Sequence, residues 1–221
     1  MRIIVTAGPT REYLDPVRFL SNPSTGKMGF AIAAEAARRG HEVTLVAGPV
    51  ALKTPKGVER VDVVSAREMM AAVLAAVGDS KRTTARETVL IATAAVADWR
   101  PAKCATKKLK KGEMSGVLKL VRNPDIVKTV DSYRKRSKAV GLRLVGFAAE
   151  TDHVLGEAAR KCREKGLLFI VANDVTQKGC GFGTDTNKVT FVFPDGTQRK
   201  FPLMTKRRVA MEILKESERE W

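Results

Sequence analysis

The sequence predicts an α/β protein with a Rossmann-like, mainly parallel sheet flanked by helices. Three observations lead to this prediction. Strand-like and helix-like segments alternate along most of the 221 residues. Several strand-like segments are almost wholly apolar, which is typical of strands buried on both faces. Long loops follow several of these strands, and in such sheets ligands bind beyond the carboxyl ends of the strands.

The composition indicates a globular chain that forms one domain over residues 1–221, since 44% of the residues are hydrophobic and no linker is evident. Neither a membrane-spanning apolar run nor a signal peptide is present. Three widely spaced cysteines favour free thiols in a reducing compartment, and two histidines without a Cys/His cluster argue against a zinc site. We therefore expect a cytoplasmic protein without membrane contact.

In the first half of the chain, Ser65 and Glu68 have the spacing of a capping box, which predicts a helix that continues to about residue 77. An earlier alanine-rich helix is expected over 26–39, with Gly40 as its C-terminal stop. Strands are expected over 2–7, 41–47, 58–64 and 88–93. The last of these is very apolar, so we expect it near the centre of the sheet.

In the second half, Asn123 followed by Pro124 predicts a helix start, with Asn123 as the N-cap. Thr151 or Asp152 is expected to cap a helix that ends at Gly166. A final helix should begin at about residue 205, and strands are expected over 117–121, 142–147, 167–172, 188–193 and 197–201. The insertion 98–120 and the hairpin 188–201 could form a small subdomain or an oligomer contact.

The most informative segment runs from Ser21 to Gly29, between the first strand and the first helix. Its glycines and short hydroxyl side chains leave backbone N–H groups free at the start of the helix, where a phosphate or carboxylate binds well. The segment has neither the G-x-G-x-x-G pattern nor a Walker A loop. Gly26 and Lys27 are therefore candidates for substrate binding, and an ordinary helix start is the alternative.

The formal charge of +16 is densest from Lys103 to Lys111. This stretch is either a solvated surface or a basic flap that closes over a polyphosphate. A nucleic-acid-binding module is a less favoured alternative, because no aromatic residues interleave the basic runs. The glycine-rich segment Gly179–Gly183 suggests a loop that approaches another group closely or moves.

Two further patterns each leave an alternative open. Asp98 follows a buried strand and could hold Mg²⁺ or pair with Arg100. Lys161 and Lys165 share one face of a helix, and Glu157 precedes Lys161 by four residues, so these side chains either face a ligand or form a surface ion pair.

Together these motifs resemble the phosphopantothenoylcysteine synthetase (phosphopantothenate–cysteine ligase) family of coenzyme A biosynthesis. The segment Ser21–Gly29 is similar to the bacterial, CTP-using branch, although Thr25 replaces the commoner serine. The resemblance extends from Ile3 to about Phe193 and is strongest over 7–30, 94–100, 108–111, 123–127, 145–151 and 172–175.

The resemblance implies a reaction in two steps. CTP activates 4′-phosphopantothenate as an acyl-cytidylate with release of pyrophosphate, and the amine of L-cysteine then displaces CMP. It also implies Mg²⁺ (or Mn²⁺) and a homodimer. In bacteria the domain is often fused to a phosphopantothenoylcysteine decarboxylase. No decarboxylase portion is evident here, so the chain is a stand-alone enzyme or an excised half, and no FMN is expected on it.

By the same resemblance, Asn22 and Lys108 are the catalytic residues. Ala95 contacts the pantothenate side, and Arg18 reaches the same substrate across a dimer interface. Asp98 is the first candidate for contact with the metal. The nucleotide-binding positions are Ala94, Asp98, Lys108, Pro124, Asp125, Ile126, Val127, Phe147, Lys161 and Lys165.

A Rossmann-like NAD(P)-dependent oxidoreductase is the chief alternative. The missing glycine fingerprint argues against it. So does the end of the second strand, where Ala47 and Gly48 stand in place of an acidic residue.

Overall fold

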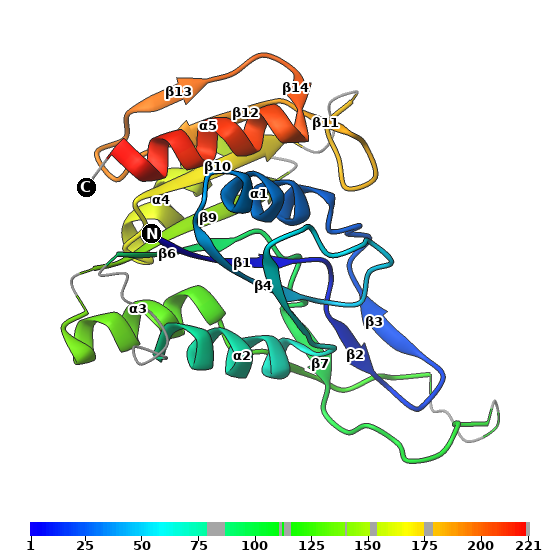
Figure 1. The fold of residues 1–221 in the computed structure, drawn as a ribbon. Helices are drawn as coiled ribbons and strands as arrows, with labels where there is room; N and C mark the ends of the chain where they lie inside the picture. Colours follow the sequence, from blue (N-terminus) through cyan, green and yellow to red (C-terminus); the bar gives the residue numbers. More distant parts are fainter. Residues whose placement is uncertain are drawn as a thin grey trace.

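The computed structural model describes residues 1–78, 87–110, 112, 116–139, 141–150, 154–174 and 179–219. Its centre is an eight-stranded sheet in the order β13-β12-β10-β9-β6-β1-β4-β5 (Figure 1). The parallel strands are β1 (Arg2–Ala7), β4 (Glu42–Ala47), β5 (Val58–Asp62), β6 (Thr88–Ala92), β9 (Leu142–Glu150) and β10 (Phe169–Asp174). The predicted fold class is therefore confirmed, with β6 at the centre as expected.

The predicted hairpin joins this sheet rather than forming a separate subdomain. Strand β12 (Val189–Val192) pairs antiparallel with β10, and β13 (Gln198–Lys200) pairs antiparallel with β12 at the edge. Because β12 supplies the buried side chains Val189 and Phe191 to the core, the hairpin is part of the main hydrophobic unit.

Helices cover both faces of the sheet (Figure 1). On one face, α1 (Lys27–Arg38) and α5 (Lys206–Arg219) pack on the cluster that contains Val5, Phe169 and Phe191. On the other face, α2 (Ala66–Gly78), α3 (Ile126–Ser137) and α4 (Val154–Glu164) pack on the cluster that contains Ile4 and Leu144. The strands are apolar on both faces because both faces are covered.

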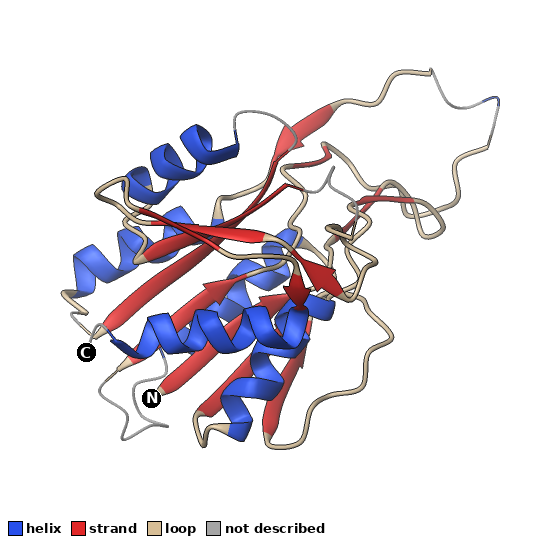
Figure 2. Ribbon diagram, turned by 90° about the horizontal axis from the view of Figure 1, so that it is seen from above, coloured by secondary structure: helices blue, strands red, loops and turns tan. Residues whose placement is uncertain are grey.

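Three two-stranded sheets lie outside the central sheet. They are β2 (Arg11–Tyr13) with β3 (Phe19–Ser21), β7 (Trp99–Pro101) with β8 (Leu120–Arg122), and β11 (Thr186–Asn187) with β14 (Met204–Thr205). The segment from β7 to β8, called the arm below, projects from the body of the molecule (Figure 2). Hence the predicted insertion 98–120 is an extension rather than part of the core.

The start of α3 corrects one prediction. Asp125, not Asn123, is the N-cap, because its carboxylate accepts the backbone N–H of Lys128 at 3.0 Å. The Asn123 amide instead donates to the carbonyl oxygen of Ala97 at 2.8 Å. Pro124 therefore lies just before the N-cap, and the hydrogen bond from Asn123 connects the loop after β6 to the start of α3. Thr151 and Asp152, the other predicted caps, lie outside the described residues.

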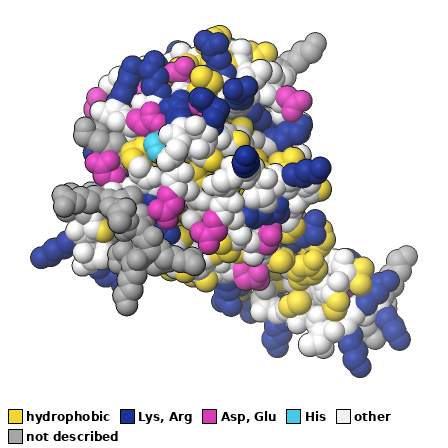
Figure 3. All heavy atoms as spheres, in the orientation of Figure 1, with side chains coloured by type: hydrophobic (Ala, Val, Ile, Leu, Met, Phe, Trp, Pro, Cys, Tyr) yellow, Lys and Arg dark blue, Asp and Glu magenta, His cyan; other side chains and the backbone are white. Residues whose placement is uncertain are grey.

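Charged side chains are spread widely over the surface. Figure 3 shows Lys and Arg over much of one face, interspersed with Asp and Glu, with further basic side chains at the end of the arm. Within the described part of the chain, no helix has both the length and the apolar character needed to span a bilayer.

Candidate functional site

Helix α1 begins with free backbone donors that face a cavity. Its N-cap Gly26 has a φ of 77°, and no side chain caps the helix. The N–H groups of Lys27, Met28 and Gly29 have no acceptor among the described residues, and all three residues line the cavity. The predicted helix start with unbonded backbone N–H groups is therefore present at the cavity, and anion binding there stays a prediction.

Gly29 allows this helix start to lie against the sheet. A Cβ atom at this position would lie 2.5 Å from the Cβ of Ala7 and 2.5 Å from the Oγ1 of Thr93. Only a residue without a side chain fits between β1 and the end of β6, so glycine is required for the close approach.

This first cavity has a volume of about 470 Å³ and lies at the carboxyl edge of the sheet. The loops after β1, β6 and β10 and the end of β9 meet there, as predicted for a parallel sheet. It is lined by Asn22, Ser24, Gly26, Lys27, Met28, Gly29, Thr93, Ala94, Ala95, Val96, Asp98, Phe147, Ala148, Asn173, Gly181, Phe182, Asn187 and Lys206.

Asn22 spans the gap between the α1 loop and the β6 loop. Its Nδ2 donates to the carbonyl oxygens of Ala95 at 3.1 Å and Val96 at 3.3 Å. The side chain is thus held at the cavity wall by weak, exposed hydrogen bonds that a ligand can replace.

A second cavity of about 220 Å³ opens beside the first and shares Ala94, Val96, Asp98 and Phe147 with it. It is lined by all the other predicted nucleotide-binding residues except Lys108, namely Pro124, Asp125, Ile126, Val127, Lys161 and Lys165. The two cavities therefore adjoin along these four shared residues.

The Asp125–Lys165 ion pair forms the polar wall of the second cavity. The Lys165 ammonium lies 2.8 Å from Oδ2 of Asp125. Burial would raise the pKa of Asp125, but the N–H of Lys128 and the ammonium of Lys165 outweigh it and hold the pKa below its usual value. The Asp125 carboxylate is consequently ionised near neutral pH.

Asp98 lines both cavities and is exposed. Arg100 donates to the carbonyl oxygen of Arg122 and to Oδ1 of Asn123, so the predicted alternative of an Asp98–Arg100 pair is not observed. Within the described ranges, no three His, Cys, Asp or Glu side chains come together as a metal-binding group.

Comparison with known proteins identifies the family. A model described as the C-terminal domain of DNA/pantothenate metabolism flavoproteins (DFP) matches residues 1–219. The chain belongs to this family. The resemblance inferred from the motifs is thereby confirmed at the level of the family.

Relatives of this DFP domain include two bacterial proteins named coenzyme A biosynthesis bifunctional protein CoaBC. That of Escherichia coli (strain K12) is 48% identical over 219 residues, which cover 98% of this chain and 51% of that protein. That of Bacillus subtilis (strain 168) is 46% identical over 215 residues, which cover 97% and 50%. The chain spans about half the length of these curated relatives.

Among solved structures, the crystal structure of the C-terminal domain of a CoaBC protein matches the DFP domain with a TM-score of 0.79. It has 43% sequence identity, and the match covers 98% of this chain and 93% of that chain. The match thus covers nearly the whole of both chains.

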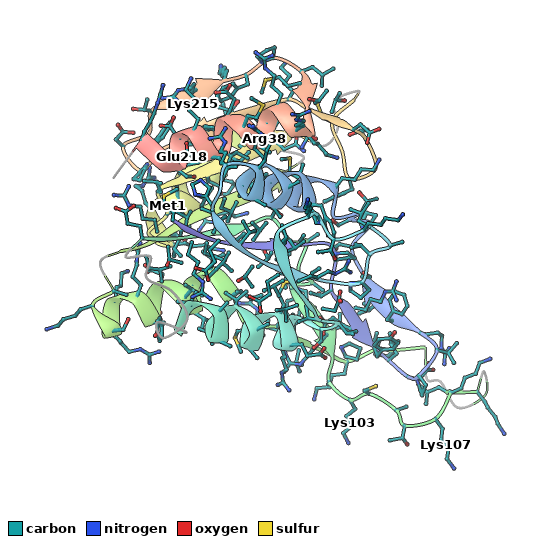
Figure 4. The ribbon with its side chains drawn as sticks, viewed as in Figure 1. Met1, Arg38, Lys103, Lys107, Lys215 and Glu218 are labelled. Atoms are coloured by element: carbon teal, nitrogen blue, oxygen red, sulfur yellow. The ribbon has the colours of Figure 1, made fainter. Side chains whose placement is uncertain are left out.

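The DFP domain brings most predicted site residues together, but two lie apart. Neither Arg18 nor Lys108 lines either cavity. Arg18 binds Asp15 and the carbonyl oxygen of Leu109, and Lys108 is exposed on the arm. The neighbouring Lys103 and Lys107 point away from the body of the molecule (Figure 4).

Lys27 lies at the cavity, but its ammonium is already engaged. It donates to the carbonyl oxygen of Gly183 at 3.0 Å and pairs with Asp185 at 2.7 Å. This pair, together with the hydrogen bond of 2.6 Å from Thr25 to the carbonyl of Phe182, fastens the glycine-rich loop to the start of α1. The loop therefore closes one side of the first cavity, as its glycine content suggested.

Three buried polar residues that line the first cavity were not among the predicted site residues. They are Asn173, Asn187 and Lys206. Asn173 lies next to the end of β10, and its position before a loop was a usable signal. Asn187 ends β11, and Lys206 begins α5; neither position carries a local motif.

Proposed function

We propose that this domain is a phosphopantothenate–cysteine ligase that joins 4′-phosphopantothenate to L-cysteine and converts CTP to CMP and pyrophosphate. The observation that carries the proposal is the pair of adjoining cavities, which share four lining residues. One presents free helix N–H groups and Asn22, and the other is lined by the nucleotide-binding positions of the motif resemblance. The coenzyme A biosynthesis named for the relatives supports the same assignment.

In the first step, a carboxylate oxygen of 4′-phosphopantothenate forms a bond to the α-phosphorus of CTP. The bond from that phosphorus to the bridging oxygen breaks, and pyrophosphate leaves. In the second step, the cysteine nitrogen bonds to the acyl carbon, CMP leaves, and the nitrogen loses a proton. Such chemistry requires alignment and neutralisation of charge rather than a covalent enzyme nucleophile.

The nucleoside is assigned to the second cavity. Its apolar walls, Pro124, Ile126 and Val127, suit a base, and Lys161 and Lys165 supply cationic donors at its polar end. The α-phosphate then lies where the two cavities join, beside Ala94, Val96, Asp98 and Phe147. This placement leaves the first cavity for the acid and the remaining phosphates.

Asn22 is assigned the stabilisation of negative charge on the acyl oxygen during amide formation. Its Nδ2 is on the cavity wall, and its present acceptors are the exposed carbonyls of Ala95 and Val96. A substrate oxygen at this wall would compete for the same donor. Loss of one such donor typically lowers the rate roughly 10²–10³-fold.

A divalent cation, Mg²⁺ or Mn²⁺, fits the oxygen donors of the first cavity. Asp98 is a carboxylate in its lining, and the Oδ1 atoms of buried Asn173 and Asn187 have no hydrogen-bond partner in the described structure. Mg²⁺ commonly binds through one or two carboxylates together with substrate phosphates. When bound, the cation would neutralise charge on the triphosphate.

The working unit is proposed to be a homodimer in which Arg18 and Lys108 act in the partner's site. Both residues belong to the projecting arm and the hairpin bound to it, away from the cavities of their own protomer. The arm also exposes apolar side chains, with Val117 82% and Leu118 42% accessible. A second copy would cover them and bring both cations to the site. A phosphopantothenoylcysteine decarboxylase, fused or separate, is the proposed consumer of the product.

A parallel assay with CTP, ATP and NADPH tests the proposal. Pyrophosphate release that requires CTP, 4′-phosphopantothenate and cysteine together is the expected result. Oxidation of NADPH would instead support the oxidoreductase alternative. DNA or RNA binding with steep salt dependence and without CTP turnover would support the nucleic-acid alternative.

A further inference from the structure

We infer that Lys206, the first residue of the C-terminal helix α5, binds the β- and γ-phosphates of the nucleotide and the pyrophosphate that leaves. The inference rests on the proposed function and adds a cation that the motif analysis did not identify. Its basis is one juxtaposition: the buried residues Lys206, Asn173 and Asn187 line the first cavity together with Asn22.

Lys206 carries a buried charge without an acidic partner. The residue is 6% exposed, and its ammonium donates to the carbonyl oxygens of Gly181 and Thr184. An ammonium has three donors, so one remains for a ligand. No carboxylate in the described part of the chain forms an ion pair with it. Asp185 is close enough to raise the pKa of Lys206, but its carboxylate pairs with Lys27.

The net charge of the cavity lining around Lys206 is therefore positive. Burial lowers the pKa of Lys206, and the neighbouring Lys27 lowers it further. The start of α1 adds the partial positive charge of its free N–H groups on the same cavity. Since an uncompensated buried cation destabilises the fold, such a group is common at sites that bind anions.

The strand order places this wall on the correct side of the α-phosphate. Ala95 follows β6, Phe147 lies in the neighbouring strand β9, and Asn173 lies in the next strand, β10. Adjacent strands are about 4.8 Å apart, so β6 and β10 are separated by about 10 Å, with Phe147 of β9 between them.

In a phosphoryl or nucleotidyl transfer, the attacking and leaving oxygens lie roughly in line with the phosphorus. The acid bound near Asn22 and Ala95 would attack from the β6 side. Pyrophosphate would then leave toward the β10 side, where Lys206 lies. The geometry thus gives Lys206 contact with the phosphates rather than with the acid.

Binding of inorganic pyrophosphate and of CMP to the full chain, measured separately by titration calorimetry, tests this assignment. Lys206→Met should weaken pyrophosphate binding about tenfold to a hundredfold, as expected for a lost charge-assisted hydrogen bond, and change CMP binding less than about twofold. Arg207→Met, an exposed cation of the same helix turn, is the matched control and should leave both affinities unchanged. Lys206→Arg should retain most of the pyrophosphate affinity.

Unchanged pyrophosphate affinity in Lys206→Met would overturn the inference. So would an equal loss of CMP affinity, because Lys206 would then act only by supporting the loop over the cavity. Lys206→Gln, which can still donate to the loop carbonyls but lacks the charge, replaces Lys206→Met if that variant does not fold. Failure of the parental chain to use CTP would instead count against the proposed function.

Discussion

The guanidinium of Arg18 donates a hydrogen bond of 2.9 Å to the carbonyl oxygen of Leu109 and so joins the β2–β3 hairpin to the arm. The fully buried Asp15 completes the joint. Its carboxylate accepts the N–H of Leu109 at 3.2 Å and the Nε of Arg18 at 3.0 Å. Both backbone groups of Leu109 are therefore fixed, and the position of the adjacent Lys108 depends on them.

Asp15→Asn is expected to loosen the arm. The hydrogen bonds from Arg18 hold the pKa of Asp15 far below its usual value, and a neutral amide would lose most of that attraction. We expect pyrophosphate release to slow about tenfold and trypsin to cleave the arm faster, with CMP affinity unchanged. Asp62→Asn, in an exposed pair with Arg60, is the control. Parental cleavage of the arm in Asp15→Asn would contradict this role.

Asn22→Ala should separate the two chemical steps. The acyl-cytidylate should still form, but its conversion to the amide should slow roughly 10²–10³-fold because a donor to the acyl oxygen is lost. Rapid quenching of a single turnover would measure both steps. Asn22→Asp, which keeps the shape but replaces the donor by an acceptor, should be equally slow. Amide formation at the parental rate would refute the proposed role of Asn22.

Lys108→Gln should slow the first step, in which the polyphosphate charge must be neutralised. We expect pyrophosphate release to fall at least about tenfold, as for other lost cationic contacts to a transferring phosphate. Lys107→Gln is the matched control, since Lys107 is an exposed neighbour on the arm (Figure 4). If the two variants behave alike, Lys108 belongs to the solvated surface.

Lys165→Met should raise the KM for CTP about tenfold with little change in kcat, because it removes a contact made equally in ground and transition states. It would also leave Asp125 unpaired at the second cavity, which adds repulsion toward phosphate. Arg163→Met, at an exposed cation in the last turn of α4 just before Lys165, provides the comparison. A tenfold lower kcat at constant KM would place Lys165 in the chemical step instead.

Ion pairs that begin at Glu35 link α1 to α5, and we expect them to make the stability of the fold sensitive to acid. Its buried carboxylate binds Arg38 and Arg39, and Arg39 also binds Glu218 of α5; Figure 4 labels Arg38 and Glu218. The Arg38 and Arg39 guanidinium groups lower the pKa of Glu35 from 4.5 to about 2, despite its burial. The stabilisation is therefore present above pH 4.5 and disappears as the pH falls toward 2.

Urea unfolding at pH 7 and at pH 3 would measure this contribution. Glu35→Gln should lower the free energy of unfolding by about 1–2 kcal/mol at pH 7, after allowance for solvent screening of exposed Arg38, and by less at pH 3. An equal loss of unfolding free energy at both pH values would mean that the ion pairs of Glu35 do not stabilise the fold.

Local patterns in the sequence were sufficient for most of the fold. Gly40 has a φ of 81° at the end of α1, and Oγ of Ser65 accepts the N–H of Glu68, which is one half of the predicted capping box. The Glu68 carboxylate accepts the N–H of Val64 and the hydroxyl of Ser65. These features depend on neighbours within a few residues, so a single sequence reveals them. The prediction that Asn123 caps α3 was wrong, because the Asn123 side chain binds a distant acceptor, the carbonyl oxygen of Ala97, and Asp125 is the N-cap instead. No local pattern in the sequence shows this acceptor.

The sequence by itself determined the succession of the main strands and helices along the chain, the free N–H groups at the start of α1, and the family. Only the tertiary structure decided which loops share a cavity. Lys206 donates to the carbonyl oxygen of Gly181 in the lining of the first cavity, while Lys108 lies apart from the site of its own chain. The physical reason is that periodicity and capping act over a few residues, whereas the crossovers of a parallel sheet bring together the ends of strands that are distant in the chain.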